Sequence, residues 1–377
     1  MRPKPPESWL RGLLVLMSLV LLLTLTASAA AAAAAVAVAA PGATPGLLKV
    51  HFIDVGQGDS ILIQTVAGAN VLIDGGPETA GSAVINYLKK AGVASLDAVI
   101  ATHPHEDHIG GLVGIMETFK VAAFYMPNAA HTTAAFRDMV AAVKASGARR
   151  IEAKAGVNLG LEGVTATMLG PLGTKYAQLN DFSAVLRLDY GTTSFLFMGD
   201  AEGVSEGQLL AAGLGHATIV KVSHHGSGSP TSQGFLKRVS PQYAVICVGA
   251  GNTHGHPDPL TISRLVKGGV AVYRTDLNGT ITASSDGKKV SVATTRTPPA
   301  AEKGKAGAGN LAPIAATGAG AVVAKPAATS ATVYITRTGE KYHLAGCRYL
   351  ARSQIPIKLA DAKAQGYTPC SVCKPPK

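Results

Sequence analysis

The six residues H-P-H-E-D-H, His103 to His108, constrain the fold of this chain more than any other part of its sequence. They follow the apolar stretch D-A-V-I-A-T, which predicts a short buried strand that ends at His103. Neutral imidazoles and carboxylates are ligands that suit Zn²⁺, Mn²⁺ and Fe²⁺. A lone histidine pair would be a surface accident or a helix cap. Three histidines and an aspartate in six residues instead predict a metal site at the end of a strand.

Short apolar runs alternate with helix-like stretches between residues 47 and 295, and this mixture predicts one layered α/β domain. Runs such as L-L-K-V-H-F-I-D-V are typical of strands, and S-A-V-I-N-Y-L-K-K-A-G is typical of a helix that Gly92 ends. Residues 296–330 are rich in Ala, Gly and Pro without aromatic residues or a period, which predicts a flexible linker. Residues 331–377 form a separate segment, too short to be stabilised by burial alone.

The motifs of the predicted domain resemble, in their order, those of the metallo-β-lactamase-fold hydrolases. H-P-H-E-D-H matches their H-x-H-x-D-H signature, with I-D-G-G upstream and F-M-G-D, S-H-H-G-S and T-H-G-H-P downstream. The stretch F-I-D-V-G-Q-G-D-S, Phe52 to Ser60, is similar more narrowly to the extracytoplasmic hydrolase domain of ComEC-type competence proteins, the DNA-uptake channels. The resemblance covers residues 49–292, leaves out the membrane channel, and implies an αββα sandwich.

The resemblance also implies two divalent metal ions, zinc or manganese, and six ligands: His103 and His105 on one metal, Asp107 and His108 on the second, Asp200 between them, and His256 as the last ligand. Asp200 would bridge because two adjacent cations need negative charge between them. The last ligand should follow a later strand and precede a helix. His256 in G-H-P-D-P-L fits that position, and His254 is the alternative.

The tandem His224-His225 resembles a motif that faces the phosphate in nuclease relatives. On that basis we interpret His225, with His224 behind it, as a general acid or transition-state stabiliser. Asp107 joins these two histidines in the predicted catalytic set. The alternative for the histidine pair is a polar turn whose hydrogen bonds are satisfied within the protein.

The sequence departs from the family pattern at N-D-F-S, Asn180 to Ser183, where many members carry a histidine that completes the shell of the first metal. Asp181 or Asn180 would substitute through oxygen, and an oxygen-richer shell favours tolerance of Mn²⁺. Asp54 and Asp59 in D-V-G-Q-G-D either position ligand histidines or cap the turn.

These features predict a metal-dependent hydrolase, and DNase or phosphodiesterase activity is the preferred interpretation. Divalent cations activate water and neutralise the attacking and leaving oxygens of a phosphodiester. One alternative is another hydrolase of the same fold, a choline-phosphate esterase or a lactonase. A second is a non-catalytic protein that binds DNA or the cell envelope, against which the intact H-x-H-x-D-H and Asp200 argue. The predicted substrate is single- or double-stranded DNA, and we expect a monomer.

The first 46 residues predict export from the cytoplasm. Three basic residues precede L-L-V-L-M-S-L-V-L-L-L-T-L, and the small residues A-S-A at positions 27–29 suit a signal peptidase. The alternative is an uncleaved membrane anchor, because the apolar stretch with its alanines is long enough to cross a bilayer. Either interpretation predicts a secreted or extracytoplasmic protein.

The C-terminal segment predicts a structural zinc site on four residues: His343, Cys347, Cys370 and Cys373. A metal there would supply the folding free energy that so small a core lacks. A disulfide is the alternative because the chain is predicted to be exported. K-Y-H-L-A-G-C-R-Y-L with G-Y-T-P-C-S-V-C-K-P resembles the small zinc modules related to the metal-binding domain of the Ada repair protein. The fourth cysteine, Cys247, lies in an apolar strand pattern and is expected to be buried.

The net charge of +11 resides in the tail and not in the predicted hydrolase domain. Residues 47–295 carry 19 Lys or Arg against 19 Asp or Glu, whereas residues 331–377 carry eight against two, a net charge of +6. Arg337, Arg348 and Arg352 could therefore follow a nucleic-acid backbone. A solvated basic face or a cell-wall anchor is the alternative.

Overall fold

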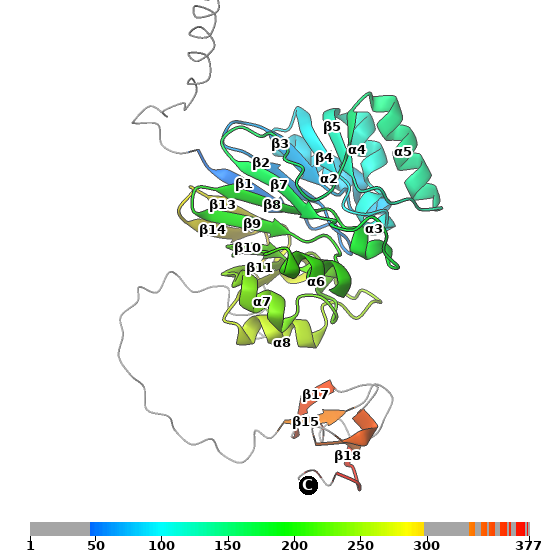
Figure 1. Ribbon diagram of the computed structural model, residues 1–377, viewed down its shortest axis with the longest axis vertical. Helices are drawn as coiled ribbons and strands as arrows, with labels where there is room; N and C mark the ends of the chain where they lie inside the picture. The colour runs from blue at the N-terminus through cyan, green and yellow to red at the C-terminus, as the bar shows by residue number, and fades with distance from the viewer. Residues whose placement is uncertain are drawn as a thin grey trace, which may run out of the picture. The chain divides into compact units, whose positions relative to one another are not determined.

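The computed structural model describes residues 46–297 and, towards the C-terminus, residues 332–335, 341–344, 347–350, 355–359, 362, 367–373 and 375. The chain divides into two compact units, residues 1–311 and 312–377 (Figure 1). The predicted signal or anchor lies outside the described residues except for Gly46, and so does nearly all of the predicted linker. Among the helices of the described ranges, none is both long and apolar enough to span a membrane.

Two sheets form the larger unit. One is eight-stranded, in the spatial order β14 (Val290–Thr294), β13 (Ile281–Ser285), β1 (Leu48–Phe52), β2 (Ile61–Gln64), β3 (Asn70–Ile73), β4 (Ser95–Ile100), β5 (Lys120–Met126) and β6 (Arg149–Glu152). The other is six-stranded, in the order β12 (Ala271–Arg274), β11 (Tyr243–Ile246), β10 (Ile219–Lys221), β9 (Thr193–Phe197), β8 (Val185–Tyr190) and β7 (Thr165–Gly170). The strands β3 to β6 run parallel to one another, as do β9 to β12.

The two sheets pack face to face through one apolar layer. Phe52 of β1 and Phe197 of β9 meet in this layer with their ring centroids 6.2 Å apart. Because side chains alternate along a strand, β9 is buried on both faces: Phe195 and Phe197 contact the opposite sheet, and Leu196 contacts the helices outside. This strand therefore has no solvent-exposed face.

Helices cover the outer face of each sheet (Figure 1). The eight-stranded sheet carries η1 (Glu78–Ala80), α2 (Gly81–Lys90), α3 (Glu106–Ile109), α4 (Leu112–Thr118) and α5 (Ala134–Ser146). The six-stranded sheet is associated with η2 (Leu179–Phe182), α6 (Gly203–Ala211), η3 (Ser223–Gly226), α7 (Gln233–Val239), α8 (Pro259–Lys267) and α9 (Thr275–Asn278). The predicted αββα sandwich is confirmed.

Local sequence signals explain where these helices begin and end. The side chain of Asp258 accepts a hydrogen bond from the Leu260 amide at 2.7 Å, and Pro259 follows at the first helical position of α8. Gly147 ends α5 in the left-handed region at φ 72°, where glycine has no steric penalty. The predicted helix before Gly92 is α2.

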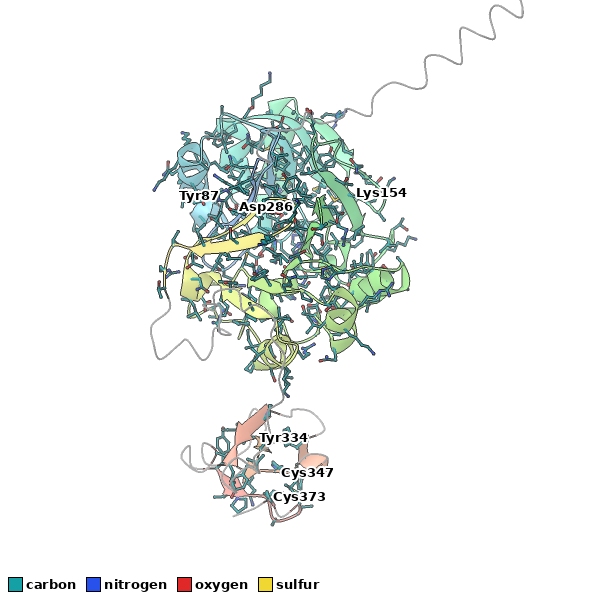
Figure 2. All side chains as sticks on the ribbon, turned by 90° about the vertical axis from the view of Figure 1, so that its left-hand side faces the viewer. Tyr87, Lys154, Asp286, Tyr334, Cys347 and Cys373 are labelled. Carbon is teal, nitrogen blue, oxygen red and sulfur yellow. The ribbon has the colours of Figure 1, made fainter. Side chains whose placement is uncertain are left out.

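One buried polar group lies in the wall of the larger unit, away from the predicted ligands. His51 of β1 is 8% exposed, and its Nδ1 lies 3.0 Å from the hydroxyl of Tyr87 on α2. Figure 2 labels Tyr87 in the larger unit. Thr282 of β13 places its hydroxyl 3.2 Å from the same nitrogen. Burial lowers the pKa of His51, so this histidine is held in its neutral form.

The smaller unit contains two short two-stranded sheets around a small apolar cluster. Its elements are β15 (Thr332–Ile335), β16 (Lys341–Tyr342), η5 (Arg348–Leu350), β17 (Ile355–Lys358) and β18 (Thr368–Pro369). The strands β15 and β17 are antiparallel, and β16 and β18 are parallel. The cluster comprises Val333, Ile335, Tyr342 and Ala362 with a few partly buried neighbours, which is a small apolar core for an independent unit.

Candidate metal centre

The predicted ligands are brought together by loops that leave neighbouring parallel strands. H-P-H-E-D-H follows β4, Asp200 follows β9, and S-H-H-G follows β10. The carboxyl ends of parallel strands lie at one edge of a sheet, which is where polar side chains of an α/β fold form binding sites. The site therefore takes its residues from both sheets of the sandwich.

One carboxylate oxygen lies at the centre of the group. Asp200 is 2% exposed, and four histidines place their Nε2 atoms close to its Oδ2: His108 at 3.3 Å, His225 at 3.4 Å, His224 at 3.7 Å and His103 at 3.9 Å. The Nδ1 atom of His105 lies 3.0 Å from His103 Nε2. Asp107 completes the group, with its Oδ2 3.1 Å from His225 Nε2 and 3.8 Å from His108 Nε2.

Hydrogen bonds behind the ring fix the orientation of His108. Asp74 accepts from His108 Nδ1 at 2.8 Å, and also from the amide and hydroxyl of Thr102 at 2.8 and 2.7 Å. An imidazole that donates from Nδ1 presents an unprotonated Nε2 to a metal. His108 Nε2 is buried and has no hydrogen-bond partner within the described part of the chain. Asp74 thus supports the ligand loop.

His225 is fixed in the same way from the second sheet. Its Nδ1 donates to the carbonyl oxygen of Cys247 at 2.8 Å, which directs Nε2 towards Asp107 and Asp200. Cys247 itself is fully buried, as expected from its strand pattern. Nε2 of His225 therefore lies among the candidate ligand atoms.

The loop that carries His225 adopts a backbone conformation that few side chains tolerate. His224 and His225 have φ values of 47° and 50°, in the left-handed region, which costs about 1–3 kcal/mol for each non-glycine residue. Neighbouring groups hold the loop in place: Arg264 donates to the carbonyl of Thr231 at 3.0 Å, and Glu206 accepts from the Thr231 amide at 2.6 Å. Such strain is typical of functional sites.

His224 is held by a partner of its own. Its Nδ1 contacts Oε1 of Glu202, and the other oxygen of Glu202 contacts the hydroxyl of Ser229. The His224 side chain is 26% exposed, more than any of the histidines His103, His108 and His225. It is therefore a half-exposed imidazole beside the ligands, with Nε2 directed at the site.

The charges of the group explain its protonation. Burial lowers the pKa of His108 and of His225, but the carboxylates of Asp200 and Asp107 raise it by more, so that both lie well above the usual range. Burial raises the pKa of Asp200, and the two histidines lower it by more. Two protonated imidazoles thus neutralise these carboxylates in the metal-free protein, and a bound cation would take their place.

The residues fit divalent cations. The ligand atoms of His103, His108 and Asp200 lie within 4.8 Å of one another, and so do those of Asp107, His108 and His225. The two groups share His108, and the Nε2 atoms of His108 and His225 both lie near Oδ2 of Asp200, which fits two neighbouring cations. His108 Nε2 and Asp200 Oδ1 are buried and have no hydrogen-bond partner inside the described ranges. Bound cations would provide partners for such buried polar atoms.

Three predicted ligands are outside these groups: His105, which contacts His103 Nε2, and His256 and Asp181. His256 follows β11, and its ring centroid lies 5.1 Å from that of His224 and 6.4 Å from that of His225. Burial, together with His224 and His225, lowers the pKa of His256 to about 4. Asp181 is 2% exposed, and its carboxylate accepts from the Ser205 amide at 2.9 Å in the first turn of α6. His256 therefore borders the site, and Asp181 supports a helix.

The position of the missing histidine is occupied by Asn180. Its Nδ2 lies 3.4 Å from His224 Nδ1, and its buried Oδ1 has no hydrogen-bond partner among the residues that the structure places. The alternative ligand His254 is exposed and stacks on His256 with the ring centroids 5.8 Å apart. Among Asn180, Asp181, His254 and His256, the buried side-chain atoms without a hydrogen-bond partner in the described ranges are Asn180 Oδ1 and His256 Nδ1.

A comparison with known protein families agrees with this geometry. The sequence model of the metallo-beta-lactamase superfamily matches residues 53–250. The chain belongs to this superfamily. The match begins just before the D-V-G-Q-G-D loop and includes every predicted ligand except His256.

Relatives within the metallo-beta-lactamase superfamily include competence proteins. ComE operon protein 3 of Bacillus subtilis (strain 168) is 30% identical over 251 residues, which cover 62% of this chain and 32% of that protein. Competence protein ComA of Neisseria gonorrhoeae is 29% identical over 231 residues, 60% of this chain and 31% of that protein. This chain thus matches about a third of the length of these relatives. Among solved structures, the metallo-beta-lactamase fold protein YhfI from Bacillus subtilis is 16% identical with a TM-score of 0.42, covering 61% of this chain and 96% of that one.

Three neighbours of this superfamily site were not singled out from the sequence. Lys221 ends β10 and is fully buried beside Asp59 and Asp200. A lysine within the apolar run T-I-V-K-V-S is unusual, and this pattern could have identified it from the sequence. Glu202 lies two residues after Asp200, and no sequence pattern distinguishes it from a surface glutamate. His131 places its ring 6.1 Å from that of His105, on a loop in which a single histidine carries little information.

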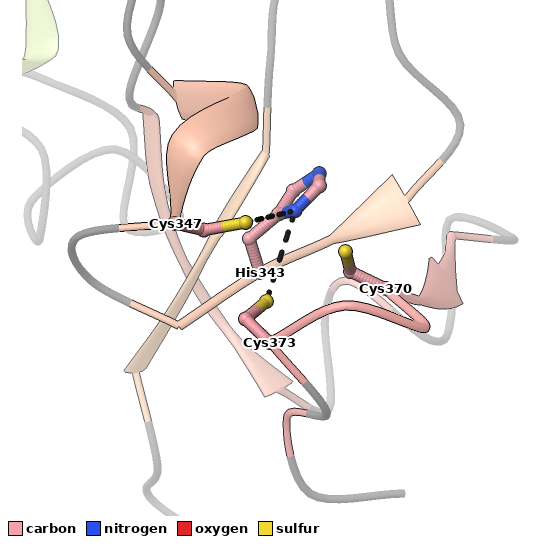
Figure 3. A group of neighbouring side chains, drawn as sticks. All are labelled: His343, Cys347, Cys370 and Cys373. Atoms are coloured by element: carbon pink, nitrogen blue, oxygen red, sulfur yellow. Dashed lines mark hydrogen bonds between the residues drawn. The ribbon is translucent and has the colours of Figure 1, made fainter.

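The smaller unit holds the second candidate metal site. The ligand atoms of His343, Cys347, Cys370 and Cys373 all lie within 4.8 Å of one another (Figure 3). His343 Nδ1 is 3.3 Å from Cys347 Sγ and 3.9 Å from Cys373 Sγ, and all three cysteines are free thiols. Two backbone amides point at sulfur: Leu344 at Cys373 and Val372 at Cys370, at 3.3 and 3.4 Å. Such amides stabilise thiolates, so the cluster suits a tetrahedral metal site better than a disulfide.

The predicted nucleic-acid contacts of this unit remain predictions. Arg337 and Arg352 lie outside the described residues, and Arg348 begins η5.

Proposed function

We propose that this protein is an exported, metal-dependent phosphodiesterase that hydrolyses DNA. The observation that supports it most is the gathering of His103, His108 and His225 around one oxygen of Asp200, with His224 beside them. The names of the relatives support the choice of DNA, since they are competence proteins, and so does the basic C-terminal unit. The export part of the proposal rests on the N-terminal sequence pattern.

In this proposal each residue of the site has a definite task. His103, His105 and Asp200 would hold one divalent cation, and Asp107, His108, His225 and the same Asp200 a second. Cations held there activate water and neutralise charge on the phosphodiester oxygens. Asp74 and the Cys247 carbonyl keep the His108 and His225 rings in place. His225 is thereby reassigned from general acid to ligand.

His224 is the residue that we assign to proton donation. Its contact with Glu202 holds Nδ1, and Nε2 faces the site from a half-exposed position. In its imidazolium form this histidine can donate a proton from Nε2 to the leaving alkoxide oxygen of a DNA strand. General acids contribute about 10²- to 10⁴-fold to such reactions.

The first test is cleavage of DNA by the purified mature chain. Linear and circular DNA are incubated with Mn²⁺, Zn²⁺ or a chelator, beside the variant His103→Ala. We expect degradation that depends on metal and on His103. Failure to degrade DNA with any metal would refute the nuclease proposal, and a fully active His103→Ala variant would refute the site.

The second test separates proton donation from metal binding. The variant His224→Ala should lose about 10²- to 10⁴-fold in DNA cleavage but far less in cleavage of bis(p-nitrophenyl) phosphate, whose leaving group needs no proton. The matched control is His254→Ala, in the neighbouring loop. Equal losses on both substrates would assign His224 to the metals or to the fold.

The third test concerns the C-terminal unit, which we propose holds the enzyme on DNA through a zinc-stabilised basic module. Removal of residues 331–377 should weaken DNA binding in a salt-dependent way and leave cleavage of the small diester unchanged. Unchanged DNA affinity would assign this unit to another partner.

A further inference from the structure

A buried lysine lies directly behind the candidate metal centre and has no task in the proposed mechanism. Lys221 is the last residue of β10, and its side chain is fully buried. Its ammonium contacts Oδ2 of Asp59, donates to the carbonyl of Gly199 at 3.2 Å, and lies 3.8 Å from Oδ1 of Asp200. Burial of a lysine is costly unless it is paired, so this position requires a positive charge.

The two oxygens of Asp200 face different groups. Oδ2 faces the Nε2 atoms of four histidines at 3.3 to 3.9 Å, and Oδ1 faces Lys221. Oδ1 is buried and, within the described ranges, accepts no hydrogen bond. The lysine is therefore the group that distinguishes one oxygen of this carboxylate from the other.

Lys221 also keeps other cations away from the carboxylate of Asp59. Its Oδ1 lies 3.4 Å from Nδ1 of His225, and Asp59, Asp200 and His225 form a group whose ligand atoms lie within 4.8 Å of one another. Such a group could itself attract a cation to the rear of the site. The ammonium of Lys221 occupies the space beside both carboxylates and neutralises Asp59.

We propose that Lys221 is a positioning residue of the metal centre: a fixed cation between Asp59 and Asp200 that turns Oδ2 of Asp200 towards the metals. This inference rests on the proposed two-metal site. On this proposal, the positive charge of Lys221 sets the orientation of the Asp200 carboxylate. Loss of the lysine should therefore change how the two metals are coupled, in addition to how well the protein folds.

The experiment compares Lys221→Met, Asp59→Asn and the double variant in the full-length protein, with Lys267→Met as an exposed control. Each is titrated with Mn²⁺ by calorimetry, and the electron paramagnetic resonance spectrum is recorded for exchange coupling between two Mn²⁺ ions. The melting temperature of the metal-free protein is measured in parallel. Lys221→Met alone should melt lowest, because it leaves the buried Asp59 carboxylate unpaired.

The double variant removes both charges and should recover most of the lost melting temperature. Its Mn²⁺ affinity should still fall by about 10- to 100-fold, and its coupled signal should disappear, because no fixed cation then faces Oδ1 of Asp200. Asp59→Asn retains the lysine and should retain the coupled signal. If the double variant folds poorly, Asp59→Asn still decides, because loss of coupling there would assign the effect to Asp59 and overturn the proposal.

Two further results would also overturn it. The first is a double variant that binds two Mn²⁺ ions with the affinity and spectrum of the unmodified protein, because Lys221 would then only neutralise Asp59. The second is an unmodified protein that binds no Mn²⁺ pair, which removes the metal centre itself. An unmodified protein that binds a coupled pair but does not cleave DNA contradicts the proposed function and leaves the role of Lys221 intact.

Discussion

Replacement of Gly58 by alanine tests how closely the D-V-G-Q-G-D loop packs against the ligand loop. Gly58 is buried with φ at +136°, and a Cβ atom there would lie 2.2 Å from the carbonyl oxygen of Asp107 and 3.0 Å from Cδ of Pro77. The next residue, Asp59, donates its amide to the same Asp107 oxygen at 3.2 Å. The new methyl group cannot move aside, because backbone atoms oppose it.

The expected loss of stability follows from two contributions. A positive φ costs an L-residue about 1–2 kcal/mol. Overpacking against a rigid neighbour costs about 1–3 kcal/mol more. The free energy of unfolding should thus fall by roughly 2–5 kcal/mol, a large part of the about 5–15 kcal/mol that holds a typical domain. Because the clash displaces Asp107, Mn²⁺ affinity should fall as well.

Gly56 in the same loop is the matched control. It has φ at +74°, but a Cβ there would meet no atom within 4 Å. Gly56→Ala should therefore lose only the backbone contribution of about 1–2 kcal/mol and keep its Mn²⁺ affinity. The assay is urea unfolding of the metal-free protein, followed by circular dichroism. With an m-value of about 3 kcal/mol per M of urea, the unfolding midpoint should shift by roughly 0.7–1.7 M for Gly58→Ala. For Gly56→Ala the shift should be roughly 0.3–0.7 M. Equal midpoints for the two variants would refute the packing argument.

Three further predictions concern ligands and protonation. His225→Ala should lose one of two bound metals while His256→Ala keeps both, as measured by metal analysis of the purified proteins; the reverse result would restore His256 as a ligand. Cys373→Ser should lose the zinc of the smaller unit and Ser371→Ala should not, and zinc retained by both would contradict the site. Since burial lowers the pKa of His51, its protonation favours the unfolded state, so stability should fall as the pH decreases below about 6.5, the unperturbed value. This fall should be shallower in His51→Gln, and identical pH dependence would show that His51 does not contribute.

The layered fold was predictable because several independent motifs agreed with the apolar pattern. H-P-H-E-D-H could be located at a strand end because D-A-V-I-A-T is continuously apolar. Asp200 could be located for the same reason, since F-L-F-M ends where G-D begins. In both cases the candidate ligand lies three residues beyond the end of the strand, His103 after β4 and Asp200 after β9, so no knowledge of strand order was needed.

The choice between His225 and His256 did depend on strand order, which the sequence does not show. Asp200 follows β9, His225 follows the adjacent β10, and His256 follows β11, one strand farther away. Both histidines satisfy the same local pattern, so only their distance from β9 separates them. The sequence also does not show which way Asp181 points. Its carboxylate accepts a hydrogen bond from α6, whereas the side-chain oxygen of its neighbour Asn180 has no hydrogen-bond partner within the described ranges.

The division of the candidate ligands between two sheets has a consequence for how the protein matures. His103, His105, Asp107 and His108 belong to the first sheet, whereas Asp200 and His225 belong to the second. A cation shared between them acts as a reversible cross-link that can close only after both halves have folded and docked. An exported chain that meets its metal outside the cytoplasm would therefore be locked at its destination. Its metal content would then report on the completion of folding.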